Sequence, residues 1–237
     1  MPETGLTMRM AAIALGLLLI GPAAQAATDE PFGLSTVAAT EGALTTTWRH
    51  LQLEMQSDER IVVQCRAEPR SCTSPAALRF IAIVNEGNGH EGLARIGLIN
   101  RAVNLAIGAA NAAAIQSTWS SPLQTLATGS GDCKQYAVLK YAALINAGFA
   151  ANDLRLVIVR IKQPPNPGAK PADHALVAVR NDADWIVLDN RSLAMIESRQ
   201  VLDHYLPLFA LDHRSVRQFV QPASLDAVAA PCGESGG

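Results

Sequence analysis

The stretch from residue 129 to residue 148, GSGDCKQYAVLKYAALINAG, constrains the fold most because it encodes a helix with defined ends. Asp132 follows two glycines and can accept hydrogen bonds from the free N–H groups of a starting helix. Gln135 stands at the third helical position, where its amide can reach back in a variant of the capping box. Apolar residues then recur every three or four positions, and Gly148 can close the helix. The sequence therefore predicts a core helix that begins at Cys133.

The position of Cys133 favours a reactive sulfur. The positive end of the helix dipole stabilises thiolate over thiol, and the cation Lys134 is its neighbour in sequence. Gly129 and Gly131 leave an approach to the sulfur and to nearby backbone N–H groups, which could hold an oxyanion. A small buried cysteine in a core helix fits the same residues. A nucleophile therefore requires a partner base elsewhere in the chain.

The N-terminus has the features of a secretory signal peptide over residues 1–26. Arg9 precedes an apolar run from Met10 to Ile20, and Ala24-Gln25-Ala26 is the small-x-small pattern that signal peptidases cleave. The run is shorter than the roughly 18 residues of a membrane-spanning helix. An uncleaved N-terminal anchor is the alternative. We expect a periplasmic protein, without stable membrane insertion once the signal is removed.

Composition narrows the partners and the domain organisation. The chain has 19 basic and 21 acidic residues and a net charge of −2, which does not favour a nucleic-acid surface. Beyond the signal peptide we expect an N-terminal arm and helix over 27–64, one domain over 65–222, and a disordered tail over 223–237.

Four cysteines divide into a pair and two single residues. Cys65 and Cys72, with Pro69 between them, indicate a local disulfide across a turn in an oxidising compartment. The spacing does not suit zinc. Cys232 lies in the Gly-rich tail. Cys133 is then expected to be unpaired in the fold.

Periodicity changes from helical to extended after Gly148. Helical patterns are expected over 44–56, from Pro75, and over 93–110, where Asn100 and Asn104 need partners if they are buried. Strands are expected over 154–161, and over 174–180 and 185–189 as a hairpin. The fold class predicted is α+β, with the Cys133 helix packed on an antiparallel sheet.

The hairpin supplies the base. If Asn181 pairs with Asp184, Asp189 lies diagonal to His174 on one sheet face, and a turn shifted by one residue puts Asp189 directly opposite His174. Either register keeps the two side chains within reach of an imidazole–carboxylate hydrogen bond. A carboxylate on Nδ1–H would orient the ring and stabilise the imidazolium. Taken singly, His174 could be a strand-start residue and Asp189 a turn former. Together they predict a Cys133–His174–Asp189 triad.

Other residues have smaller expected roles. Trp119 lies shortly before the cysteine helix, and its indole is expected in the core or in the wall of a cleft. Trp119 and Asp132 are therefore our candidates for residues of the oxyanion site or the cleft. The remaining histidines lack comparable neighbours and are expected at the surface: His50, His90, His204 and His213.

Five motifs of this chain belong together: Ile99-Asn100-Arg101-Ala102-Val103-Asn104, Trp119-Ser120-Ser121-Pro122-Leu123, Gly131-Asp132-Cys133, Asp173-His174-Ala175 and Trp185-Ile186-Val187-Leu188-Asp189-Asn190. In this combination the chain resembles the bacterial transglutaminase-like cysteine peptidases of the LapG type. The resemblance spans roughly Cys65 to Val220. It implies a papain-like or transglutaminase-like α+β fold, with N-terminal helices, and periplasmic peptidase activity.

The resemblance also implies a substrate, a regulator and a metal. Members of this family cleave surface adhesins and so release biofilm cells, under the control of an inner-membrane cyclic-di-GMP receptor. They bind calcium through acidic residues that flank the catalytic cysteine. Asp132 is the one such candidate here, because Lys134 and Gln135 stand where acidic residues are common, and lysine cannot ligate calcium. The thiol chemistry itself requires no cofactor.

The function predicted is that of an exported cysteine peptidase acting on a protein or peptide through a thioester intermediate. A transamidase would use the same triad, with an amine in place of water. Two hypotheses from different classes are a catalytically silent peptide-binding module and a purely structural exported domain.

Overall fold

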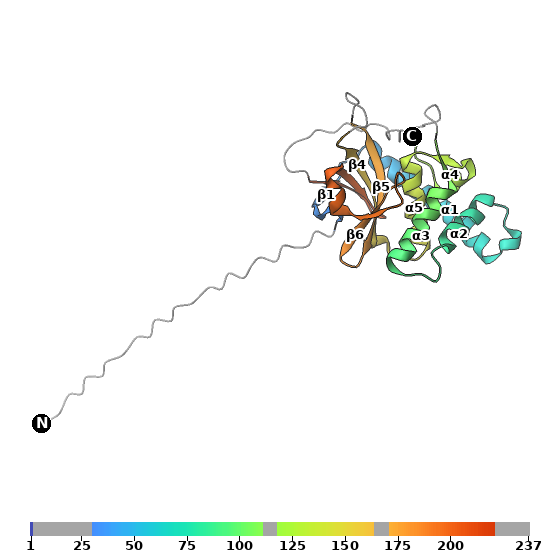
Figure 1. Cartoon of the computed structure of the whole chain (residues 1–237), viewed down its shortest axis with the longest axis horizontal. Coiled ribbons are helices and arrows are strands. Elements are labelled where there is room, and N and C mark those ends of the chain that lie inside the picture. Colours follow the sequence, from blue (N-terminus) through green and yellow to red (C-terminus); the bar gives the residue numbers. More distant parts are fainter. Residues whose placement is uncertain (2–29, 111–117, 164–170, 221–237) are drawn as a thin grey trace.

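The computed structural model describes residue 1 and residues 30–110, 118–163 and 171–220. The predicted tail over 223–237, and the predicted signal peptide apart from its first residue, lie outside this part of the chain. Helices lie on one side of the molecule and strands on the other (Figure 1). Within the described residues, no helix is long and apolar enough to cross a membrane.

In the described part of the chain, five α-helices precede the strands of the main sheet, apart from one short N-terminal strand. They are α1 (Ala43–Ala67), α2 (Pro75–Asn85), α3 (Gly92–Ala106), α4 (Pro122–Thr128) and α5 (Cys133–Asn146). Both α2 and α4 begin with Ser-Pro: the hydroxyls of Ser74 and Ser121 accept from the N–H groups of Ala77 and Gln124. The proline needs no partner for its nitrogen at the first helical position. The helix expected over 44–56 is longer than predicted, and the one expected over 93–110 ends earlier.

Helix α1 is part of the same core as the rest of the chain. It runs through the domain boundary predicted between residues 64 and 65, and its buried Trp48, Leu51 and Val62 belong to the main hydrophobic cluster. The predicted disulfide between Cys65 and Cys72 is present and joins the end of α1 to the approach to α2.

Within the ranges that the structure describes, the strands form a seven-stranded sheet in which every neighbouring pair is antiparallel. Its order is β1 (Thr36–Ala38), β9 (Val216–Phe219), β8 (Tyr205–Leu211), β4 (Leu154–Ile161), β5 (Asp173–Asn181), β6 (Asp184–Leu188) and β7 (Met195–Glu197). A two-stranded parallel sheet pairs β2 (Gly108–Ala109) with β3 (Ser130–Gly131). Short 3-10 helices complete the described elements: η1 (Pro31–Gly33), η2 (Pro69–Ser71), η4 (Ala151–Asp153) and η5 (Ser198–Asp203). These features confirm the α+β class.

Helix α5 lies at the centre, packed against β4 and β5 with α2, α3 and α4 around it. Its residues from Cys133 to Leu144 are all buried. The predicted cap is present: Asp132 accepts from the N–H of Lys134, and the Gln135 amide oxygen accepts from the N–H of Asp132. A Cβ at Gly131 would lie 2.5 Å from the Cβ of Gln135, so a glycine is needed for this close approach.

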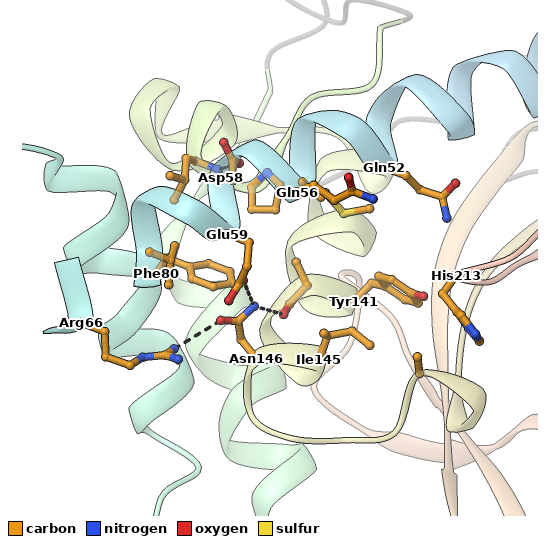
Figure 2. Close-up of a pocket in the computed structure, with 16 residues that line it drawn as sticks. Gln52, Gln56, Asp58, Glu59, Arg66, Phe80, Tyr141, Ile145, Asn146 and His213 are labelled. Carbon is orange, nitrogen blue, oxygen red and sulfur yellow. Dashed lines mark hydrogen bonds between the residues drawn. The ribbon is translucent and has the colours of Figure 1, made fainter. Parts of the chain in front are cut away.

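Polar contacts join the end of α5 to α1 beside a pocket of about 440 Å³ (Figure 2). The Asn146 amide donates to the Glu59 carboxylate at 2.7 Å and accepts from the Arg66 guanidinium at 3.3 Å. The pocket lining includes Tyr141 and Ile145 of α5 but none of the predicted triad residues. It is therefore separate from the site described below.

Lys140 is an unusual core residue of α5. Its side chain is 1% exposed, and its ammonium nitrogen has no hydrogen-bond partner among the described residues. Burial lowers the pKa of Lys140 to about 7, against the opposing effect of the negative charge of Asp189. A buried ammonium without a partner disfavours the folded state when it is charged.

We predict that Lys140→Met stabilises the protein at and below pH 7. The folded-state pKa of Lys140 lies below its unfolded value of about 10.4. The buried lysine therefore lowers the free energy of unfolding most below pH 7, and this destabilisation decreases as pH rises toward 10. The expected gain in the free energy of unfolding at pH 6 is on the order of 3 kcal/mol. Urea unfolding from pH 5 to pH 10 measures it. The exposed Lys162→Met is the control, and parallel pH curves for wild type and Lys140→Met contradict the prediction.

Candidate active site

The β5–β6 hairpin brings His174 and Asp189 into direct contact. Asn181 pairs with Asp184, the register that predicted this contact. The imidazole Nε2 lies 2.8 Å from the Asp189 Oδ1. Our expectation that the carboxylate would hold Nδ1 is wrong, because Asp189 contacts the other ring nitrogen, Nε2. Nδ1 is buried and has no hydrogen-bond partner among the described residues, which leaves it available to accept a proton.

Asp189 is held by three further donors. Its Oδ1 accepts from the N–H of Arg191 at 3.0 Å, its Oδ2 accepts from the Tyr205 hydroxyl at 2.7 Å, and its carbonyl accepts from the Asn104 amide at 3.4 Å. Burial alone would raise the pKa of Asp189, but the hydrogen bond and charge of His174, with the Arg191 and Tyr205 donors, hold it well below its usual range. Asp189 is therefore a fixed carboxylate at neutral pH.

Tyr205 contacts both members of this pair. In addition to its hydrogen bond to Asp189, its ring stacks on the His174 ring with centroids 5.9 Å apart. Burial, and then the charge of Asp189, raise the pKa of Tyr205, so it remains a donor. Sequence reasoning missed Tyr205, because it comes from β8, for which we predicted no strand. The short continuous apolar run from Tyr205 to Leu211 is the signal that could have indicated the strand.

Cys133 is the first residue of α5, as predicted, and is 4% exposed. Since α5 packs on β5, the chain segments that carry Cys133 and His174 belong to neighbouring elements. The sulfur of Cys133 is disulfide-bonded in this structure. Our expectation of an unpaired Cys133 is therefore wrong for this oxidised form. Cys232 lies outside the described residues.

The segment before Cys133 is tied to the start of α5. Gln135 donates from its amide to the Thr118 carbonyl at 2.8 Å, next to Trp119. Trp119 is partly buried and packs against the main core. Its role as a cleft residue stays a prediction. His50, His90, His204 and His213 are all exposed, as expected.

Asn100 and Asn104 differ in their surroundings. Asn104 contacts the Asp189 carbonyl, as described, whereas neither amide atom of the buried Asn100 has a partner among the described residues. Among the described residues, the expectation that both amides would find partners is thus met only by the Asn104 amide nitrogen, because the Asn104 amide oxygen is also buried without a partner. Ordered water is the usual partner of such groups.

Asp132 is the candidate calcium ligand, and both of its carboxylate oxygens are already used. Oδ1 accepts from the N–H of Lys134 at 2.9 Å, and Oδ2 lies 2.6 Å from the Lys134 ammonium. Among the described residues, no three His, Cys, Asp or Glu side chains form a group that could hold a metal ion.

The fold is similar to that of solved structures of one bacterial protein. Legionella pneumophila LapG superposes with a TM-score of 0.52 at 15% identity, over 68% of this chain and 87% of that chain. The calcium-bound form of that protein superposes with a TM-score of 0.53 at 13% identity, over 71% of this chain and 92% of that chain. The EGTA-treated form superposes with a TM-score of 0.53 at 15% identity, over 71% of this chain and 88% of that chain. At these identities the likeness shows the fold. Comparison with curated proteins gives no match.

The family model of bacterial transglutaminase-like cysteine proteinases matches residues 60–210. This span runs from the last part of α1 into β8 and contains Cys133, His174 and Asp189. The chain belongs to the family of bacterial transglutaminase-like cysteine proteinases.

Proposed function

We propose that this cysteine peptidase uses Cys133 as nucleophile, His174 as general base and acid, and Asp189 as the group that orients His174. The contact between His174 and Asp189 carries the proposal, because it fixes the ring while leaving Nδ1 without a partner among the described residues. The capped start of α5 supports it further, since the helix dipole favours a thiolate there.

The chemistry follows from these positions. Nδ1 accepts the proton of the Cys133 thiol, and the sulfur attacks a peptide carbonyl. The tetrahedral oxyanion is stabilised by backbone N–H groups near Cys133. His174 returns the proton to the departing amine, which leaves a thioester on the sulfur. Water, deprotonated by His174, then attacks the thioester and releases the acid and the thiol.

We propose a protein substrate that reaches the enzyme in the periplasm, after export through the predicted signal peptide over residues 1–26. A surface adhesin is the substrate class that the family resemblance suggests, with an inner-membrane receptor as regulator. Hydrolysis is favoured over transamidation because the family is one of proteinases. Cleavage of an extended protein substrate, followed by mass spectrometry of the products, tests hydrolysis directly.

The first prediction from this mechanism concerns thiolate formation. Reduced wild type should react with iodoacetamide at Cys133 faster than a model thiol at pH 6–7, because His174 removes the proton. His174→Ala should abolish the enhancement, and Asp189→Asn should lower peptidase activity about 10²-fold. Cys133→Ser should lower it at least about 10³-fold. His213→Ala, an exposed histidine, is the control. Equal alkylation rates in wild type and His174→Ala would contradict the assignment of the base.

The second prediction concerns redox state. A disulfide sulfur cannot attack a carbonyl, so the oxidised protein should be inactive and a dithiol should restore activity by exchange. Peptidase assays before and after reduction, with mass mapping of the alkylated cysteines, measure this. Full activity without reductant, lost in Cys133→Ser, would show that the disulfide does not persist in solution.

The third prediction concerns Tyr205 as a positioning residue. Tyr205→Phe keeps the ring stacked on His174 but removes the donor to Asp189, and kcat should fall about 10-fold with KM nearly unchanged. Tyr136→Phe is the matched control, since it also removes a buried hydroxyl, one that donates to the Ile107 carbonyl. If both variants lose stability and activity equally, Tyr205 has a structural role alone.

A further inference from the structure

The residues that flank Cys133 form a nearly buried ion pair. The Lys134 ammonium lies 2.6 Å from the Asp132 Oδ2, and the two side chains are 10% and 8% exposed. Both groups belong to the first turn of α5 or its cap, so one residue on each side of Cys133 supplies a charge. Because water is largely excluded, the attraction is screened less than at a surface.

Calcium is the cation that the family resemblance implies at this place, and these residues do not fit it. Calcium takes six to eight oxygen ligands, several of them anionic. Here both Asp132 oxygens accept from Lys134, and the Gln135 amide oxygen accepts from the N–H of Asp132. A divalent ion at Asp132 would have to displace an ammonium that is covalently part of the chain and repels it.

We propose that the Lys134 ammonium is a built-in cation at Asp132, so that this protein holds the start of α5 without calcium. The ammonium neutralises the one carboxylate beside Cys133, and it fixes that carboxylate as the helix cap. Without the ammonium, Asp132 would place an uncompensated negative charge next to the sulfur, which disfavours a thiolate. The activity readouts below rest on the proposed peptidase function, whereas the binding and melting readouts do not.

The first experiment titrates the reduced wild-type protein with calcium chloride after treatment with EGTA. We expect no saturable heat of binding up to 1 mM calcium and no change in melting temperature between 1 mM calcium and 1 mM EGTA. A ligand present at 100 times its Kd would raise the melting temperature by several degrees. The rate of Cys133 alkylation should be equal in the two conditions.

The second experiment removes the ammonium. Lys134→Met leaves Asp132 buried without its partner, and we expect the melting temperature to fall by at least about 4 °C and alkylation at pH 7 to slow about 10-fold. Lys134→Arg, which keeps a cation, should melt within about 2 °C of wild type. Lys162→Met changes an exposed lysine and should match wild type in both measurements.

Two results would overturn the proposal. One is saturable calcium binding by wild type that Asp132→Asn abolishes. The other is a Lys134→Met protein that melts and alkylates like wild type. If Lys134→Met does not fold, the wild-type titration and Lys134→Arg still decide. If wild type binds no calcium and its Cys133 alkylation does not depend on His174, the peptidase mechanism is rejected and the ion-pair proposal still stands.

Discussion

The capped start of α5 is the constraint on which the rest of the structure depends. The Asp132 side chain accepts from the N–H of Lys134, and the Gln135 side chain accepts from the N–H of Asp132, which together fix where the helix begins. Because α5 is buried along nearly its whole length, its start also fixes how the sheet and the other helices pack around it. A shift of one residue at the cap would rotate every core position of α5 by about 100° and move Cys133 away from its place.

Local signals in the sequence predicted the parts of the site that depend on short-range geometry. The cap at Asp132 and the hairpin register at Asn181 each involve residues a few positions apart, where stereochemistry leaves few choices. Because successive side chains of a strand point to opposite faces of the sheet, this register placed His174 and Asp189 on the same face. The disulfide between Cys65 and Cys72 was predictable for the same reason, since only six residues separate the two cysteines.

Long-range packing decided the features that the sequence did not predict. Tyr205 reaches Asp189 only because β8 joins the sheet beside β4, and the choice of Nε2 over Nδ1 depends on how the His174 ring turns against that tyrosine. The length of α1 follows from the burial of Trp48 and Val62 against the core rather than from its own weak periodicity. The spacing of the cysteines did not indicate the disulfide at Cys133.

The short span of the Cys65–Cys72 bridge has a consequence for tolerance of reducing conditions. In the chain-entropy account, a bridge that closes a loop this small raises the free energy of the unfolded chain by about 2.5 kcal/mol, whereas a bridge that closes a 100-residue loop raises it by about 4.7 kcal/mol. Opening this bridge therefore removes a modest part of the stability, while α1 stays anchored to the core through Trp48 and Leu51. A reductant strong enough to release the Cys133 sulfur leaves that anchorage in place.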